Sequence, residues 1–204
     1  NNMNKKGCLI GLIGFLSVII IIAIACVIYG INTNNKIVTA EESVNSQWAK
    51  VENQYQRRAD LIPNLVNTVK GYASHEKETL DAVISARAKA TQITIDPTNL
   101  NETSLHKYQK AQGELSQALG RLLAVTENYP DLKANQNFLE LQAQLEGTEN
   151  RISTERTRYT DSVKEYNTLI RKFPASIIAS MNGFEKKPQF EAEAGAERAP
   201  EVKF

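Results

Sequence analysis

The order of apolar and polar residues divides the chain into an uncharged N-terminal stretch and a long region of helical periodicity. Residues 8–31 form a run of 24 positions without Asp, Glu, Lys or Arg. At 1.5 Å per residue, a helix of this length covers about 36 Å, enough to cross a hydrocarbon core of roughly 30 Å. The pattern therefore predicts one membrane-spanning helix, with membrane lipid as its first partner.

The length of this stretch favours a retained anchor over a cleaved signal peptide. The apolar region of a signal peptide covers only about 7 to 15 residues. Ala23-Ile24-Ala25-Cys26 is similar to a lipoprotein processing site, but the residues after it remain apolar. Lys5 and Lys6 precede the stretch and Lys36 is the first charge after it, so the positive-inside rule predicts a cytoplasmic N-terminus and an extracytoplasmic main domain.

Beyond the span, apolar residues recur at steps of three and four, as in amphipathic helices. This periodicity predicts three long helices and a short one that Gly183 ends, at about 41–91, 105–128, 135–172 and 175–182. Pro63 falls within the first, where we expect a kink, because proline removes the hydrogen bond to the Ala59 carbonyl. Short connections between long helices indicate antiparallel packing. The predicted fold is all-α: a single N-terminal transmembrane helix followed by an elongated antiparallel helical bundle.

The expected organisation has four parts. They are a short flank at 1–7, the transmembrane helix at 8–31, a helical domain at 32–183 and a C-terminal tail at 184–204. The tail lacks periodicity, but Phe184, Phe190 and Phe204 could dock it on the bundle.

Composition and motifs exclude several classes of function. Beyond the span there are 22 basic and 23 acidic residues, a net charge of −1, which argues against a nucleic-acid partner. His75-Glu76 begins like a zinc-protease motif, but Thr79 stands where the second histidine belongs, and His106 has no ligand set around it. No phosphate-binding loop or nucleophile elbow is present. We therefore expect no catalytic residue, cofactor, metal or small-molecule substrate.

At the N-terminal end of the span, Gly7, Gly11 and Gly14 fall on one helix face. Small residues at this spacing let two helix backbones approach closely, which predicts self-association. The alternative is that glycine is simply common in membrane helices.

Polar residues are dense at two places inside the predicted helices. Arg58 and Arg87 belong to the first helix, and Glu146, Glu149 and Asn150 share one face of the third. If these helices pack antiparallel, Arg58 or Arg87 could meet Glu146 or Glu149 in an interhelical network that sets helix register. The alternative is a set of solvated surface pairs of little energetic value.

These same segments carry a resemblance to the LemA family of bacterial membrane proteins. The matching residues are Trp48-x-x-Val51-x-x-x-Tyr55-Gln56-Arg57-Arg58-x-Asp60-Leu61-Ile62-Pro63-Asn64-Leu65-Val66, Val69-Lys70-Gly71-Tyr72-Ala73-x-His75-Glu76, Tyr129-Pro130-x-Leu132-Lys133-Ala134, Leu145-Glu146-Gly147-Thr148-Glu149-Asn150-Arg151-Ile152, Tyr166-Asn167, Phe173-Pro174 and Pro200-x-Val202-x-Phe204. Tyr159-Thr160 departs from the Tyr-Asn that the family pattern usually shows there. The resemblance implies a membrane helix and a long helical domain outside the cytoplasm, with no established activity, cofactor or catalytic residue.

Two functions fit these expectations. The first is a non-enzymatic, membrane-anchored scaffolding protein that assembles with copies of itself. The second is an adaptor that recruits another membrane or envelope protein, such as a protease.

Overall fold

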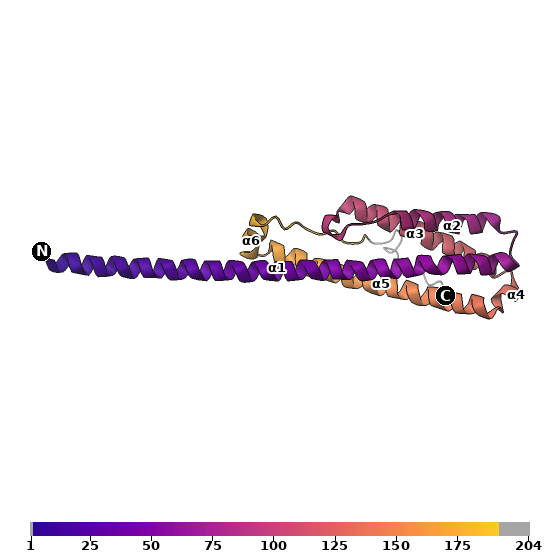
Figure 1. Cartoon of the computed structure of the whole chain (residues 1–204), viewed down its shortest axis with the longest axis horizontal. Coiled ribbons are helices and arrows are strands. Elements are labelled where there is room, and N and C mark those ends of the chain that lie inside the picture. The colour runs from indigo at the N-terminus through magenta and orange to yellow at the C-terminus, as the bar shows by residue number, and fades with distance from the viewer. Residues whose placement is uncertain (1, 192–204) are drawn as a thin grey trace, which may run out of the picture. The chain divides into compact units, whose positions relative to one another are not determined.

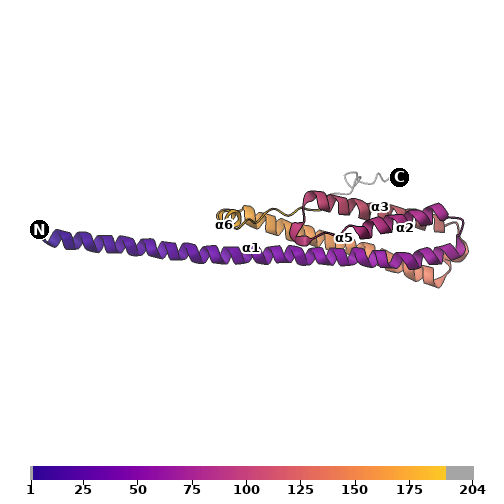
Figure 2. The ribbon, with the colours of Figure 1, turned by 45° about the horizontal axis from the view of Figure 1, so that its top comes forward.

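The computed structural model describes the backbone of residues 2–191 and the side chains of residues 11–191 (Figures 1 and 2). All of the regular secondary structure in the described residues is helical. These are α1 (Asn2–Tyr72), α2 (Lys77–Gln92), the 3-10 helix η1 (Pro97–Asn99), α3 (Glu102–Thr126), α4 (Pro130–Lys133), α5 (Gln136–Arg171) and α6 (Ala175–Met181). The predicted all-α class is confirmed.

The helices belong to two compact units. The first unit contains α1 up to residue 42 together with residues 165–186, and the second contains residues 43–164 together with the segment that begins at Lys187. Each unit has its own buried side chains, and each is described by itself below.

Helix α1 joins the predicted membrane span to the start of the bundle without an interruption. Between Leu12 and Ile31 its large apolar side chains are 45 to 66% exposed, and none of them is covered by protein. Among the described residues, α1 is the one helix long and apolar enough to cross a membrane. Its apolar surface requires a nonpolar environment that the described chain does not itself provide.

The predicted continuous helix over 41–91 is wrong, because the chain turns at residues 73–76. The Glu76 N–H donates to the Ala73 carbonyl in this turn, and α2 then packs on α3. Ala73 and Leu80 are both buried, and they stand seven residues apart. A seven-residue step preserves the phase of a helical stripe, so the pattern of apolar residues concealed the turn.

Asparagine side chains cap the starts of two later helices. Asn101 opens α3 in a capping box with Ser104, three residues before the predicted start, and the Asn135 side chain accepts from the Phe138 N–H at the start of α5. Helix α4 was not predicted. Proline is well suited to the first position of a new helix, which is the place of Pro130 in α4.

Within the second unit, α1 and α5 run antiparallel, as expected. Arg58 bonds to Glu149, and further along α1 the Tyr72 hydroxyl accepts from Asn135, near the beginning of α5. Buried aliphatic and aromatic side chains from α1, α2, α3 and α5 fill the space between these contacts, and Leu132 of α4 joins them. The largest cluster includes Ile62, Leu65, Val69, Val83, Leu115, Leu122, Leu132, Phe138 and Leu145.

Candidate functional site

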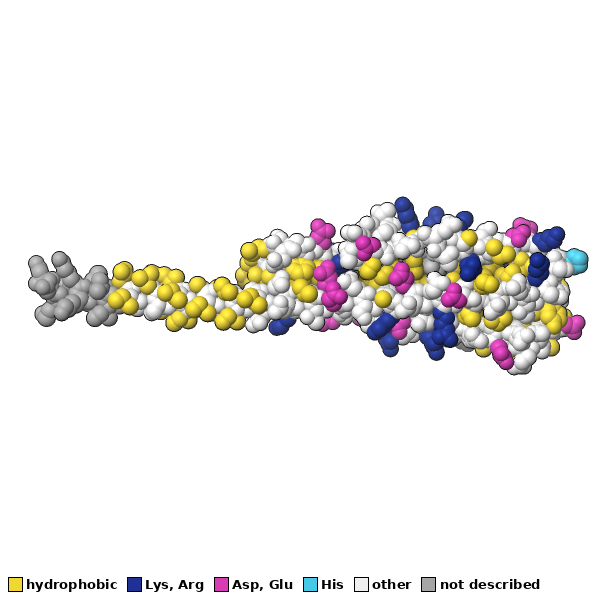
Figure 3. Space-filling view, viewed as in Figure 1, with side chains coloured by type: hydrophobic (Ala, Val, Ile, Leu, Met, Phe, Trp, Pro, Cys, Tyr) yellow, Lys and Arg dark blue, Asp and Glu magenta, His cyan; other side chains and the backbone are white. Residues whose placement is uncertain are grey.

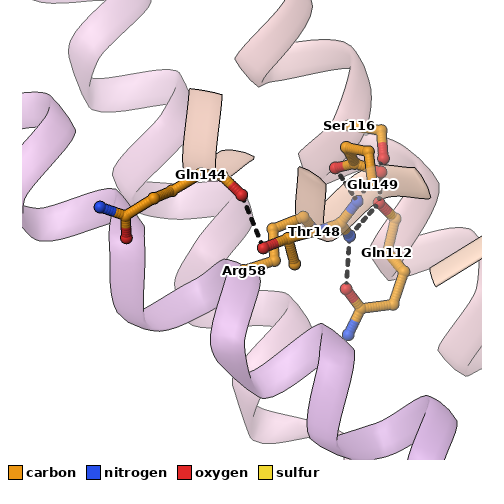
Figure 4. A network of polar contacts seen from close by, with 6 residues as sticks. All are labelled: Arg58, Gln112, Ser116, Gln144, Thr148 and Glu149. Atoms are coloured by element: carbon orange, nitrogen blue, oxygen red, sulfur yellow. Dashed lines mark hydrogen bonds and ion pairs between the residues drawn. The ribbon is translucent and has the colours of Figure 1, made fainter. Parts of the chain in front are cut away.

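A buried arginine on α1 is the centre of the polar contacts in the second unit. The side chain of Arg58 is only 1% exposed. Its Nη1 donates to Ser116 Oγ at 2.6 Å and to Glu149 Oε1 at 2.8 Å, and its Nη2 donates to the carbonyl and side-chain oxygens of Gln112 at 3.0 and 2.6 Å (Figure 4). One guanidinium group therefore joins α1 to α3 and α5.

The surroundings of Arg58 show how a buried charge is accommodated. Four hydrogen bonds satisfy the two Nη groups, and the guanidinium carbon lies 5.1 Å from the centre of the Tyr55 ring. The side chain of Glu149 is 40% exposed, so its carboxylate retains contact with water while it neutralises the arginine. Beside this site, Thr148 is buried and donates to the Gln144 carbonyl at 2.8 Å (Figure 4).

The structure brings together only two of the five residues proposed for this network. Arg58 and Glu149 meet, but Glu146 and Asn150 are exposed, and Glu146 accepts from Gln142 on its own helix. Arg87 lies on α2, where its Nε donates to the Ala59 carbonyl at 2.8 Å. A role for the network in helix register stays a prediction.

Gln112 and Ser116 were missed, although Gln112 carries a recognisable signal. It falls four residues after Tyr108 and three before Leu115, within a stripe of buried apolar residues on α3. A polar residue in such a stripe needs a buried partner. Arg58, the buried cation of α1, is that partner.

A second cluster, of aromatic side chains, holds the beginning of the C-terminal tail. The ring of Trp48 lies edge-to-face with Tyr108 and Tyr159, at 5.3 and 5.6 Å between centroids, and stacks on Phe190 at 6.0 Å. The Tyr159 hydroxyl donates to the Pro188 carbonyl at 2.9 Å. Burial raises the pKa of both Tyr108 and Tyr159 above the usual range for a phenol.

Beyond Phe190, the tail bonds to α3 through its backbone. The side-chain amide of Gln109 donates to the Glu191 carbonyl at 2.8 Å and accepts from the Glu191 N–H at 3.1 Å. Of the three phenylalanines proposed to dock the tail, Phe190 therefore lies on the second unit. Phe184 lies in the first unit, half-buried after the end of α6, and Phe204 falls outside the described residues.

The glycines of the membrane segment form a strip on the part of α1 that the described chain leaves uncovered. A Cβ atom placed on Gly11 or Gly14 would meet no atom within 4 Å. The side chain at position 7 lies outside the described part of the chain. Figure 3 shows apolar side chains along this segment on the face in view. The strip is available for close approach by another helix, and self-association there stays a prediction.

Candidate metal ligands do not gather in the part of the chain that the structure describes. No group of three or more His, Cys, Asp or Glu side chains there is placed to hold a metal ion. His106 lies 3.9 Å from Glu191 on the surface, and His75 belongs to the exposed turn before α2. Neither histidine belongs to a group of described side chains that could hold a metal ion.

Comparison with known proteins assigns the chain to a family. The fold and site define an all-α protein whose first helix is long and apolar enough for a membrane and whose bundle is joined by a buried arginine. A family model described as the LemA family matches residues 47–204, so the chain belongs to the LemA family. The resemblance found in the sequence is thereby confirmed.

Several curated relatives are similar to the chain over most of its length. It is 26% identical to magnetosome proteins MamQ 1 and MamQ 2 of Paramagnetospirillum magneticum over 198 residues, 88% of this chain and 70% of each relative. It is 22% identical to protein LemA of Metamycoplasma hominis over 149 residues, 73% of this chain and 64% of that protein. Together with the apolar part of α1, the family places the chain among membrane-associated proteins.

Proposed function

We propose that the chain is a non-enzymatic structural protein of the bacterial cell membrane, which assembles with copies of itself through its membrane helix. The observation that carries this proposal is the uncovered glycine strip of α1. Gly11 and Gly14 have no neighbouring atoms where a side chain would begin, and the apolar residues around them are exposed. Close packing of helix backbones is a main source of helix association in lipid, where the hydrophobic effect gives no help.

The interior of the second unit supports a structural role. Its polar centre, Arg58, is already engaged by Gln112, Ser116 and Glu149. Its aromatic centre is engaged by the tail through Phe190. These groups hold helices and tail in place, which suits a scaffold whose task is to keep a shape.

The mass of the full-length protein in detergent, measured by light scattering over a wide concentration range, tests the proposal. We expect an oligomer that dissociates on dilution. The double substitution Gly11→Leu and Gly14→Leu would fill the glycine strip, so it should shift the equilibrium between oligomer and monomer toward the monomer. Ala23→Leu is the matched control, because Ala23 lies on the opposite side of the same helix. A wild-type protein that stays monomeric at every concentration contradicts the proposal.

A second candidate function, an adaptor for another membrane or envelope protein such as a protease, is favoured by a different surface. Tyr72 and Leu139 are each 45% exposed near the end of the second unit where α1 ends and α5 begins. Crosslinking in native membranes separates the two functions. Self-crosslinks as the main product support the scaffold, and one foreign protein recovered in a fixed ratio supports the adaptor.

The proposed orientation places the N-terminus in the cytoplasm and the second unit outside it. Lys5 and Lys6 on one side of the span, against Lys36 on the other, support this orientation. A cysteine at Lys36, in a chain whose own cysteines are replaced by serine, should react with an impermeant thiol reagent on intact cells. Reaction only after the cells are opened would reverse the orientation.

A further inference from the structure

Helix α6 exposes apolar side chains on one of its faces. Its sequence, ASIIASM, has no charged residue, and Ala175 and Ala179 are buried. On the other side Ile177 and Met181 are 50 and 78% exposed, and Phe173, four residues before Ile177, is 81% exposed. A step of four places Ile177 and Met181 on one side of α6, and the exposed ring of Phe173 lies in the turn that precedes the helix; we name these three residues the α6 apolar face. A helix that is apolar on opposite sides ordinarily has both of them covered.

One contact in the first unit places α6 along α1, and an electrostatic effect places the end of α5. Burial raises the pKa of Tyr166 on α5 to about 12, and the charge of Glu41 on α1 adds to this rise, so Glu41 lies near Tyr166. Further on, the Cδ1 atom of Ile178 lies 3.6 Å from the position that a Cβ on Gly30 would occupy. Between Glu41 and Gly30, α1 advances about 16 Å toward its uncharged segment.

Gly30 is the last residue but one of the uncharged stretch 8–31. Because this stretch is the candidate membrane span, Gly30 marks the level at which α1 leaves the hydrocarbon core. Helix α6, which lies against Gly30 through Ile178, is therefore at the boundary between the bilayer and water. Figure 3 shows apolar side chains gathered at this place, where α6 meets α1 in Figure 1.

Basic residues outnumber acidic ones around α6. Arg171 and Lys172 precede Phe173, and Lys186 follows α6 directly after Glu185; all four are exposed, and we name the three basic residues the basic flank. No acidic residue occurs between Glu165 and Glu185. Basic residues beside an apolar helix face are typical of helices that lie in a membrane interface containing anionic lipids.

We propose that α6 is an interfacial helix, whose apolar face inserts into the surface of the same bilayer that α1 spans. The basic flank then contacts the phosphate groups of anionic lipids. Lipid is favoured over a second copy of the chain because the α6 apolar face adjoins the membrane span itself. The first unit is thus attached to the membrane at two points, which restricts rotation of α1 about its axis. This inference holds for a scaffold and for an adaptor alike.

A fluorescent label on the α6 apolar face tests the insertion. In the full chain with Cys8→Ser and Cys26→Ser, Met181→Cys receives an environment-sensitive dye, and Glu165→Cys on α5 is the matched control. The proteins are reconstituted in vesicles of phosphatidylcholine and phosphatidylglycerol. We expect nitroxide-labelled lipid to quench the dye at position 181 and a water-soluble nitroxide to quench it at position 165. Both side chains are exposed, and unchanged emission of Trp48 verifies the fold of the second unit.

Two results would overturn the insertion. In one, position 181 responds to the water-soluble nitroxide as position 165 does. In the other, position 181 is shielded from both quenchers, because a second protein copy covers the α6 apolar face. For the basic flank, replacement of its three residues by glutamine should reduce lipid quenching at position 181 in anionic vesicles and leave it unchanged in pure phosphatidylcholine. Equal quenching with and without the basic flank in anionic vesicles overturns the headgroup contact.

Discussion

Arg87 on α2 donates a hydrogen bond to the carbonyl oxygen of Ala59 on α1, over 2.8 Å. Ala59 is buried, and its carbonyl is the one that loses its helical partner because residue 63 is proline. A cation from a neighbouring helix thus replaces the N–H that the proline lacks. The contact explains how α1 continues through Pro63 without leaving a buried acceptor unsatisfied.

The first prediction concerns this replacement. Arg87→Met removes the donor and keeps most of the aliphatic stem, so it should lower the free energy of unfolding by about 1 to 2 kcal/mol. In a Pro63→Ala background the new N–H satisfies the Ala59 carbonyl, and the same substitution should cost clearly less. Chemical denaturation of the full chain in detergent, for both single variants and the double variant, measures the difference.

Arg57→Met is the control for the first prediction, because Arg57 is exposed on α1, the helix that contains Ala59. It should change the free energy of unfolding by no more than about 0.5 kcal/mol in either background. Equal costs of Arg87→Met with and without Pro63 would mean that Arg87 does not act through the Ala59 carbonyl.

The second prediction concerns the unequal exposure of the two ion-pair partners. Arg58→Ala leaves a cavity and leaves buried polar groups of Gln112 without their partner, so it should cost about 3 to 5 kcal/mol. Glu149→Gln should cost less, about 1 to 2 kcal/mol, because Arg58 keeps its bonds to Gln112 and Ser116. Thermal and chemical unfolding of the full chain give both values.

Glu146→Gln provides the comparison for the ion pair. Glu146 lies three residues before Glu149 on the same helix but is exposed, so this change should have almost no effect on stability. A cost for Glu149→Gln no larger than that for Glu146→Gln would show that the ion pair contributes nothing beyond ordinary surface charge.

Local signals allowed much of the fold to be predicted. Asn135 predicted the start of α5, where its side chain caps the backbone. Asn101 caps α3 in the same way, but it was not recognised as a cap, and the predicted start at about 105 was three residues late. The membrane segment follows from composition alone. Residues 32–40 were assigned to neither predicted helix, and the Asn and Thr residues there have low helix propensity. Burial of Thr33 and Ile37 in the first unit stabilises a helix there nonetheless.

The polar network was predictable only in part, because it depends on which helices become neighbours. The spacing of Glu146, Glu149 and Asn150 indicates a shared face, but only packing decides that Glu149 turns toward Arg58. Arg87 was assigned to the same helix as Arg58. The unpredicted turn at residues 73–76 moved Arg87 to α2 and toward a backbone carbonyl instead. A local pattern cannot reveal such long-range partners.

The third prediction uses the single tryptophan of the chain as a reporter of tail docking. Phe190→Ala removes the ring that stacks on Trp48, so the emission of Trp48 should shift to longer wavelength as water reaches the indole. Because Phe190 is only half-buried, the cost should be about 1 to 3 kcal/mol, below that of a core phenylalanine. Limited proteolysis should also become faster after Pro188.

Phe184→Ala is the matched control for the tail. Phe184 is also half-buried, but it belongs to the first unit, whereas Trp48 belongs to the second. Its removal should leave the emission of Trp48 unchanged. Identical spectra for Phe190→Ala and the wild type would contradict docking through Phe190.

The fourth prediction concerns alkaline pH. Burial raises the pKa of Tyr159 in the folded state above its value of about 10 in the unfolded chain. Stability from the neutral phenol is therefore fully present below pH 10 and is lost as the pH rises above it, where the unfolded chain releases the proton first. At neutral pH, Tyr159→Phe should lower the free energy of unfolding by about 1 kcal/mol, because the hydrogen bond to Pro188 is lost. Above pH 10, the free energy of unfolding of this variant should fall less steeply than that of the wild type, by up to about 1.4 kcal/mol per pH unit.

Denaturation of the full chain between pH 8 and 12 measures these slopes, with Tyr72→Phe, at an exposed tyrosine, as the control. Parallel slopes for Tyr159→Phe and the wild type would mean that the Tyr159 hydroxyl ionises as readily in the folded protein as in the unfolded chain.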